Sequence, residues 1–252
     1  MIPTNLIYTW FGRKKKPESF YKYLESWKKM NPGFNIIEIN ENNFNVNLCK
    51  FTQKAYLREK WAFVSDVARL WAVNKFGGIY LDVDVEVLKP VSKLLEYNQF
   101  WAKEDVGQVN SGLIFGSEPN NLHLENILSI YKELSFPEDD LLYSVSTVQI
   151  ISKYFRKIGL SYGKKRDYLR NNVVVFEPKI FAPLHYWGGG KIKKESMTVH
   201  HYAASWIEGT HGRLSAILRY CIHEMTYNFP VFSLLNRGLT KIYKKHKIKV
   251  GN

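Results

Sequence analysis

The ten residues GGIYLDVDVE at positions 77–86 constrain the fold of this chain more than any other stretch. Gly77 and Gly78 end a helical pattern, because glycine tolerates the left-handed conformation that closes a helix. The apolar residues that follow predict a buried strand. Side chains alternate between the faces of a strand, so we expect Asp82 and Asp84 to point the same way. The stretch therefore predicts a helix, a tight turn and a core strand that carries two carboxylates on one face.

Two carboxylates at this spacing suit a divalent cation. Mg or Mn prefers carboxylate and water oxygens and also binds phosphate oxygens, so a sugar-nucleotide diphosphate is a natural candidate for the other half of the metal shell. An Asp-x-Asp triplet alone also arises by chance at solvated strand ends, which is the plain alternative. The residues upstream of the triplet favour the metal site.

Those upstream residues form an apolar pattern of helical period over residues 54–76. Asp66 and Arg69 are three positions apart in this pattern and share one helix face. A surface ion pair between them would contribute little stability. Because the segment is apolar on most sides, we expect the pair to be directed into a cleft instead.

The predicted strands and helices alternate along the chain. The expected order is a strand at 6–10, a helix at 18–29, a strand at 35–39, a helix at 54–76, strands at 79–84 and 111–115, helices at 122–134 and 147–158, strands at 173–176 and 197–202, and a helical C-terminal segment. This order indicates an α/β fold with a central, mostly parallel sheet flanked by helices. Ligands in such sheets bind beyond the carboxyl ends of the strands, so the strand ends at Trp10 and Asp82 are expected to face one crevice.

Several segments together carry a resemblance to a known family. They are Ile2-Pro3, IYTWFG at 7–12, SWKK at 26–29, SDVARLWAVNKFGGIYLDVDVEVLKP at 65–90 and HHYAASW at 200–206. In this order the chain resembles glycosyltransferase family 32, which includes bacterial capsular and exopolysaccharide glycosyltransferases and yeast initiating mannosyltransferases. Clostridial glucosylating toxins share the core pattern. The resemblance implies a GT-A-like, Rossmann-related fold.

The resemblance also implies roles for residues in the first half of the chain. Trp10 would stack on the nucleotide base, although a core tryptophan is the alternative. Asp66 and Arg69, which match the family's SDxxR, would bind hydroxyls of the donor sugar or ribose, and the arginine would also reach phosphate. Tyr80 would line the same pocket, the alternative being a buried tyrosine with a satisfied hydroxyl.

The metal shell is expected to combine the aspartates with a distant histidine. Asp84 is the stronger metal ligand, and Asp82 acts through the ribose or a metal-bound water. The segment at 200–206 resembles the family's terminal H-x-x-x-x-S-W, in which His200 is the match. Because adjacent strand residues face opposite sides, only one of His200 and His201 is expected to reach the ion. A structural histidine is the alternative.

The remaining candidate site residues lie on the acceptor side or beyond the histidines. Asn110 sits where similar transferases place a polar residue near the reacting sugar. Glu104, with Asp105 next to it, is a candidate for contacts with the acceptor. Ser205 and Trp206 complete the expected donor-binding set.

Composition agrees with a soluble enzyme. With 252 residues, of which 45% are hydrophobic and 15% aromatic, the chain can bury a sizeable core in one domain. No run approaches the roughly 18 apolar residues of a membrane span, and no secretory signal opens the chain. Cys49 and Cys221 form neither a metal pattern nor a disulfide framework, so a reducing cytoplasm is expected.

The net charge of +13 is unevenly distributed. We expect a catalytic domain at 1–210 and a helical, basic segment at 211–252, in which the last acidic residue is Glu224. Basic and apolar residues interleave beyond it, so this segment is suited to an anionic membrane surface, with a solvated helix face as the equal alternative. Nucleic acid is not an expected partner, because no binding module is recognisable and the acidic strand would repel phosphates.

The resulting expectation is a metal-dependent, retaining hexosyltransferase of cell-surface polysaccharide synthesis. The resemblance favours UDP-galactose or UDP-glucose over GDP-sugars, with Mn or Mg as cofactor and a saccharide acceptor, lipid-linked at the inner membrane face. No side chain presents itself as a nucleophile, which suits a front-face mechanism. The alternatives are a catalytically degenerate sugar-nucleotide or glycan-binding module and a metal-dependent phosphoesterase, for which a richer set of His and Asp ligands is normally required.

Overall fold

The computed structural model describes residues 1–105, 107–163, 165–185 and 190–202. The strands are β1 (Asn5–Thr9), β2 (Asn35–Ile39), β3 (Gly78–Leu81), β4 (Val85–Val87), β5 (Gln99–Asp105), β6 (Gln108–Val109), β7 (Ile114–Ser117), β8 (Asp167–Leu169), β9 (Val173–Phe176) and β10 (Thr198–His200). The α-helices are α1 (Glu18–Met30), α2 (Lys50–Leu57), α3 (Trp61–Phe76), α4 (Leu122–Glu133), α5 (Thr147–Arg156) and α6 (Pro178–Phe181), and short 3-10 helices span Ser92–Glu96, Asp139–Val145 and Arg170–Asn172.

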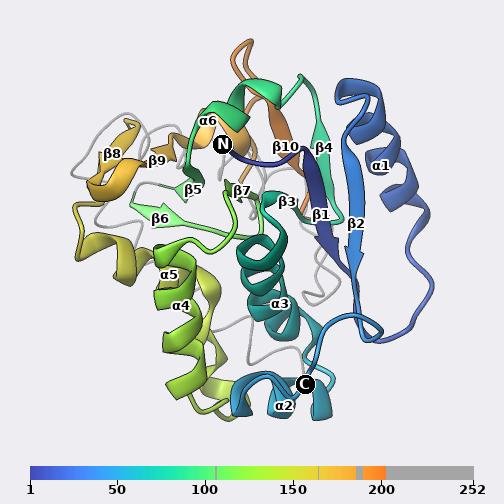
Figure 1. The fold of residues 1–252 in the computed structure, drawn as a ribbon, viewed down its shortest axis with the longest axis vertical. Coiled ribbons are helices and arrows are strands. Elements are labelled where there is room, and N and C mark those ends of the chain that lie inside the picture. Colours follow the sequence, from blue (N-terminus) through green and yellow to red (C-terminus); the bar gives the residue numbers. More distant parts are fainter. Residues whose placement is uncertain (106, 164, 186–189, 203–252) are drawn as a thin grey trace, which may run out of the picture.

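A central sheet organises the molecule (Figure 1). Its strand order is β2-β1-β3-β7-β5-β9-β8, with β6 paired to β5. The pairings make β2, β1, β3, β5 and β9 run in one direction, whereas β7, β8 and β6 run in the other. The prediction of an α/β fold with a central, mostly parallel sheet is therefore confirmed.

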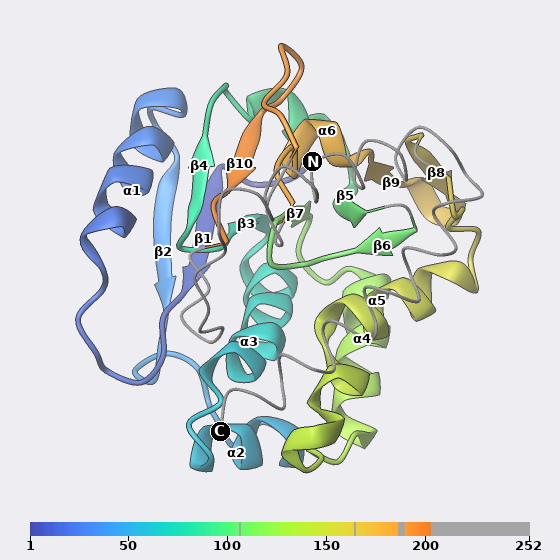
Figure 2. The same cartoon turned by 180° about the vertical axis from the view of Figure 1, so that it is seen from behind.

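The two faces of the sheet are covered differently (Figures 1 and 2). The core on one face packs α3, α4 and α5 against the sheet and includes Phe51, Trp101 and Phe155. The core on the other face includes Trp27 of α1 and Phe181 of α6, together with the residues of β4. On this second face β4 and β10 form a separate two-stranded ribbon. Each face thus buries its own apolar set, as a sheet between two layers requires.

The single helix predicted at 54–76 is wrong. The structure breaks it into α2 and α3, because Glu59 adopts a left-handed conformation with φ 55. The N–H of Lys60 then donates to the carbonyl of Ala55 at 2.9 Å, which closes α2 before α3 begins at Trp61. The predicted end of α3 is confirmed: Gly77, with φ 62, donates its N–H to Val73 at 2.9 Å.

The strand predicted at 79–84 is also too long. β3 ends at Leu81, and Asp82 and Asp84 lie in a turn that the N–H of Val85 closes by donating to the carbonyl of Asp82 at 3.1 Å. The chain leaves the central sheet here and enters the ribbon, so β4 begins at Val85. The argument from strand alternation therefore does not apply to the two aspartates, and their proximity comes from the turn.

Other predictions differ in extent or lie outside the described residues. β5 and β6 were not predicted, and β7 begins three residues later than the strand expected at 111–115. The helical, basic segment at 211–252, Cys221, Ser205 and Trp206 all lie outside the described part of the chain. Among the residues described, no helix is both long and apolar enough to cross a membrane.

Candidate functional site

The site lies at the edge of the sheet where the parallel strands β1, β3 and β5 end. Thr9 is the last residue of β1, Asp82 follows β3, and Glu104 lies near the end of β5. β7 runs the opposite way, so its beginning meets the same edge and brings residues 110–112 beside Asp82. The antiparallel strand β7 therefore adds residues 110–112 to the ends of β1, β3 and β5, at the sheet edge where α/β proteins bind ligands.

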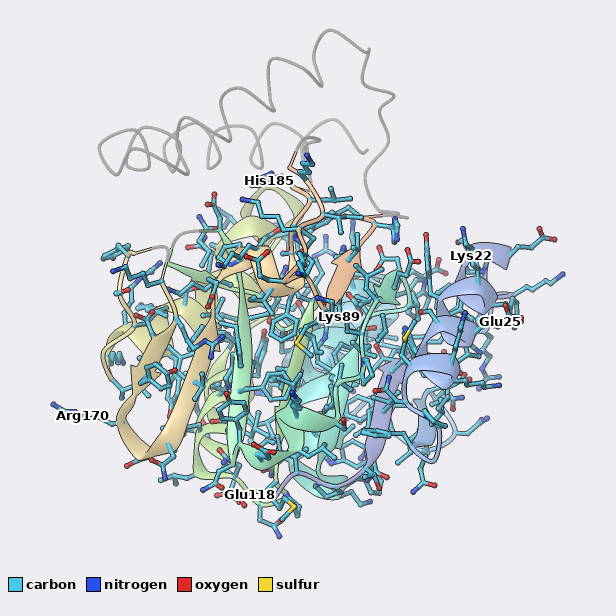
Figure 3. All side chains as sticks on the ribbon, turned by 90° about the horizontal axis from the view of Figure 1, so that it is seen from above. Lys22, Glu25, Lys89, Glu118, Arg170 and His185 are labelled. Atoms are coloured by element: carbon cyan, nitrogen blue, oxygen red, sulfur yellow. The ribbon has the colours of Figure 1, made fainter. Side chains whose placement is uncertain are left out.

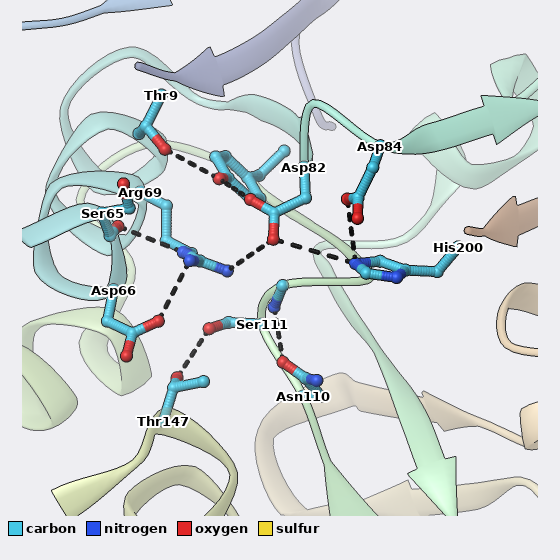
Figure 4. Close-up of polar contacts among 12 residues, drawn as sticks. Thr9, Ser65, Asp66, Arg69, Asp82, Asp84, Asn110, Ser111, Thr147 and His200 are labelled. Carbon is cyan, nitrogen blue, oxygen red and sulfur yellow. Dashed lines mark hydrogen bonds and ion pairs between the residues drawn. The ribbon is translucent and has the colours of Figure 1, made fainter. Parts of the chain in front are cut away.

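Asp82, Asp84 and His200 form a group that fits a divalent cation (Figure 4). One ligand atom from each residue lies within 4.8 Å of the others. His200 Nε2 is 3.2 Å from Asp84 Oδ1 and 3.9 Å from Asp82 Oδ2. Two carboxylates and an imidazole are donors that Mn and similar ions accept, and an ion with bonds of about 2.1 Å spans such separations.

The backbone fixes the ring of His200 in this group. The N–H of Tyr202 donates to Nδ1 at 3.1 Å, so Nε2 is the nitrogen that faces the carboxylates. Burial lowers the pKa of His200, but Asp84, Asp82 and Glu104 outweigh burial and raise the pKa overall. The negative field that raises this pKa is the same field that favours a bound cation.

The structure assigns the two histidines different partners. His201 is not in the ligand group: its Nε2 donates to Glu86 Oε2 at 2.8 Å. Its ring stacks on Tyr23 of α1, with centroids 4.7 Å apart and an interplanar angle of 14°. Of the two histidines, His200 is therefore the one that lies in the group of possible ligands.

Asp66 and Arg69 of α3 form a buried ion pair beside the metal group. Arg69 NH2 is 3.0 Å from Asp66 Oδ1, and Arg69 NH1 is 3.7 Å from Asp82 Oδ2. Arg69 Nε donates to the Ser65 carbonyl at 3.1 Å, whereas NH1 is buried without a hydrogen-bond partner. Burial raises the pKa of Asp66 to about 6, although the charge of Arg69 opposes the rise. An unsatisfied buried guanidinium nitrogen is suited to a ligand oxygen.

Tyr80 has the properties of the alternative stated for it, a buried tyrosine with a satisfied hydroxyl. Its side chain is fully buried, and its hydroxyl donates to Asp82 Oδ1 at 2.5 Å and lies 2.9 Å from Thr9 Oγ1. Burial raises the pKa of Asp82, but Arg69, His200 and Tyr80 outweigh it and lower the pKa overall. Tyr80 therefore orients Asp82, and Arg69, His200 and Tyr80 together favour its ionised form.

Residues 110–112 form the wall opposite the aspartates. Asn110 Oδ1 accepts the N–H of Gly112 at 2.7 Å, and Ser111 Oγ lies 2.7 Å from Thr147 Oγ1 at the start of α5. A Cβ added to Gly112 would lie 2.8 Å from Arg69 NH1 and 3.0 Å from Asp82 Oδ2. The backbone of Gly112 is therefore packed against Arg69 and Asp82, with no room for a side chain.

Two other predicted residues, Trp10 and Glu104, are not among the possible metal ligands. Trp10 is partly buried against the core of the α1 side, and its Nε1 donates to the Lys14 carbonyl at 2.7 Å. Glu104 is only 4% exposed and reaches the group through its charge on His200. Sequence reasoning did not find Thr9, Gly112 or Thr147. Thr9 lies within the quoted segment at 7–12 and Gly112 within the strand predicted at 111–115, whereas no local signal marks Thr147.

A family model and one curated relative match the chain. Residues 17–101 match the model described as a glycosyltransferase sugar-binding region containing a DXD motif. This region includes Asp66, Arg69 and both aspartates, and it ends before Asn110 and His200. The chain is 26% identical over 261 residues to glucan organizing enzyme 1 of Cryptococcus neoformans var. grubii serotype A, a match that covers 92% of this chain and 64% of that protein.

Solved structures are similar to the chain at TM-scores below one half. The PaToxG glycosyltransferase gives a TM-score of 0.47 at 16% identity over 62% of this chain and 69% of that one. A glycosyltransferase involved in the glycosylation of the major capsid of PBCV-1 gives 0.42 at 17% identity over 81% of this chain and 95% of that one.

Proposed function

We propose that this chain, whose residues 17–101 match the model of a glycosyltransferase sugar-binding region containing a DXD motif, transfers a hexose from a nucleoside-diphosphate sugar to a saccharide acceptor. The observation that carries the proposal is the convergence of Asp82, Asp84 and His200 within 4.8 Å, beside the buried Arg69. A cation site next to an unsatisfied guanidinium suits a diphosphate joined to a sugar better than either feature alone would.

The residues divide the work by charge. Asp82, Asp84 and His200 would hold a Mn or Mg ion, which would supply positive charge to the leaving diphosphate. Arg69 NH1 donates to an oxygen of the donor, and Asp66 holds the guanidinium at 3.0 Å while offering its second oxygen to a sugar hydroxyl. Electrostatic stabilisation of the leaving group is then the main source of rate.

The proposed transfer retains the configuration of the anomeric carbon. Asp66 and Asp82 are both engaged with Arg69, so neither is free to act as a nucleophile. The departing phosphate then accepts the proton of the acceptor hydroxyl on the same face. Inversion in the product, seen by NMR of the anomeric proton, or a trapped glycosyl-enzyme would contradict this.

The test is a screen of UDP- and GDP-sugars with the purified chain and Mn, read as release of the nucleoside diphosphate. We expect turnover with UDP-glucose or UDP-galactose that is lost on chelation. Asp84→Ala should lower the rate at least ~100-fold, about 3 kcal/mol of transition-state stabilisation. Binding of a UDP-sugar without turnover, toward any acceptor or water, would leave a binding module instead, and hydrolysis of simple phosphate esters would favour a phosphoesterase.

The acceptor we propose is a saccharide, lipid-linked at the cytoplasmic face of a membrane in polysaccharide synthesis. Support comes from the basic residues after Glu224, which suit anionic lipids. The fungal relative is named for glucan, so neutral glucose oligomers belong in the same acceptor screen. Removing the residues from Arg237 onward should weaken binding to anionic vesicles and spare donor hydrolysis, and unchanged vesicle binding would remove the membrane from the proposal.

A further inference from the structure

The two proposed ligands Asp84 and His200 are connected by a short pairing of two strands. Asp84 precedes β4, His200 ends β10, and these strands pair over only three residues each. An isolated two-stranded ribbon of this size is marginal by itself. Something else must therefore fix the distance between the carboxylate and the imidazole.

Helix α1 is bound to this ribbon along its inner face. Trp27 Nε1 donates to the Val85 carbonyl at 2.7 Å, and Ser26 Oγ accepts the N–H of Val87 at 3.0 Å. One turn earlier, Tyr23 stacks on His201. Lys22 and Glu25 are on the outer side of α1 and extend away from the body of the protein (Figure 3).

His201 links the two ligands to one another. Its backbone N–H donates to the carbonyl of Asp84 at 3.0 Å, and its side chain binds Glu86, 115 residues away in sequence. The next residue, Tyr202, has a left-handed conformation with φ 49, and this sharp turn aims its N–H at His200 Nδ1. A tyrosine in that conformation is strained, so the turn depends on contacts that hold it.

We propose that Tyr23, Glu86 and His201 form a positioning brace that sets His200 against Asp84, so that α1 controls the geometry of the metal group. The inference rests on the proposed function, because it assumes that the group binds a cation. The brace touches neither the ion nor the donor. It acts by fixing the backbone on both sides of the two ligands, as outer-shell partners do in metal sites.

The test measures Mn²⁺ binding to the full chain by the EPR signal of free Mn²⁺. His201→Ala and Glu86→Ala should each weaken binding about tenfold. Because both residues belong to one brace, the double variant should be no weaker than either single one. His201→Gln keeps a donor for Glu86 and should recover most of the affinity. Glu25→Ala, on the outer side of α1, is the matched control and should bind as the unmodified chain does.

A second readout needs no metal. The ring ¹⁵N shifts of His200 should change in the His201→Ala and Tyr23→Leu variants and remain as they are in Glu25→Ala. Unchanged shifts, or Mn²⁺ affinity retained in His201→Ala and Glu86→Ala while Asp84→Ala loses it, overturn the brace. Failure of the unmodified chain to bind Mn²⁺ overturns the metal site itself, and with it the proposed function.

Discussion

Arg69 connects the charged residues of the site. It lies 3.0 Å from Asp66 and 3.7 Å from Asp82, and its guanidinium sits 4.9 Å above the centre of the Tyr80 ring. A buried charge is strongly destabilising unless partners surround it, so these three neighbours and the arginine form one unit. Removing one of these partners should therefore destabilise the fold, so the site is better tested by a change that leaves all four side chains in place.

Gly112→Ala tests the close packing of the backbone against the arginine. The new Cβ would lie 2.8 Å from Arg69 NH1 and 3.0 Å from Asp82 Oδ2, so both side chains must shift. We expect the KM for the donor to rise about tenfold, a loss of about 1.4 kcal/mol. Gly163→Ala, whose nearest neighbour is Ser161 Oγ at 3.3 Å, is the control. An unchanged KM in Gly112→Ala would mean that the donor does not approach Arg69.

Asp66→Asn should reveal the titration of a buried carboxyl. Burial raises the pKa of Asp66 from 3.8 to about 6. At a pH between these two values, the Asp66 carboxyl is protonated in the folded state and ionised in the unfolded state. Stability from this group is complete at low pH and is lost as the pH rises through about 6. Asparagine cannot ionise, so the unmodified chain should lose about 1 kcal/mol relative to the variant between about pH 5 and about pH 8.

Urea unfolding at several pH values measures this difference, with the exposed Glu25→Gln as control. If the difference in the free energy of unfolding between the unmodified chain and Asp66→Asn does not change with pH, Asp66 is already ionised at the lower pH.

At the scale of elements, β5 joins the two halves of the sheet and carries a buried cation. Lys103 is fully buried, and its Nζ donates to the carbonyls of Gly163 and Lys165 at 3.0 and 2.8 Å. It also lies 2.8 Å from Oδ2 of Asp167, the first residue of β8. This one side chain thus ties the segment before β8 to the middle of the sheet.

Lys103→Met should destabilise the protein by about 3 kcal/mol, because it leaves the partly buried Asp167 carboxylate without its cation. Adding Asp167→Asn should restore part of the loss. The surface variant Lys93→Met should be nearly neutral. Urea midpoints measure all three, and a loss in Lys103→Met no larger than that in Lys93→Met would contradict a structural role for the buried ammonium.

The same elements show what the sequence alone can predict. Local patterns gave α1, β2 and β9 with nearly correct ends, because their apolar spacing and terminal residues are local signals. β5 was not predicted because the charged residues Lys103 and Glu104 are typical of an exposed segment. Both are buried in the structure, and the partner of Lys103 lies about 60 residues away in the sequence. The break after α2 depends on the left-handed Glu59, which no residue type announces.

The candidate site follows the same rule. Asp66, Arg69, Asp82, Asp84 and His200 were predicted because they lie in recognisable motifs, although the turn that brings the aspartates together was predicted as a strand. Thr147 and the Tyr23–His201 contact were not predicted, because they are tertiary contacts between unrelated segments.

At the scale of the whole molecule, the region matched by the family model is not a unit that can fold alone. It ends at residue 101, inside β5, and lacks β7, which pairs with β3, and β10, which pairs with β4. A fragment of residues 1–101 should therefore show no cooperative unfolding in far-UV circular dichroism and no Mn²⁺ binding, unlike the full chain. A cooperative melt of the fragment would contradict this dependence on the later strands.

The ribbon of β4 and β10 has a thermodynamic consequence. An ion shared by Asp84 and His200 would act as a cross-link that closes a loop of more than a hundred residues, and unfolding would have to release it. The free energy of unfolding should therefore increase by RT ln(1 + [L]/Kd), where [L] is the concentration of free ion. The melting temperature of the protein should rise accordingly. In cells depleted of the metal, the ion-free protein would unfold more often and would therefore be degraded faster by proteases.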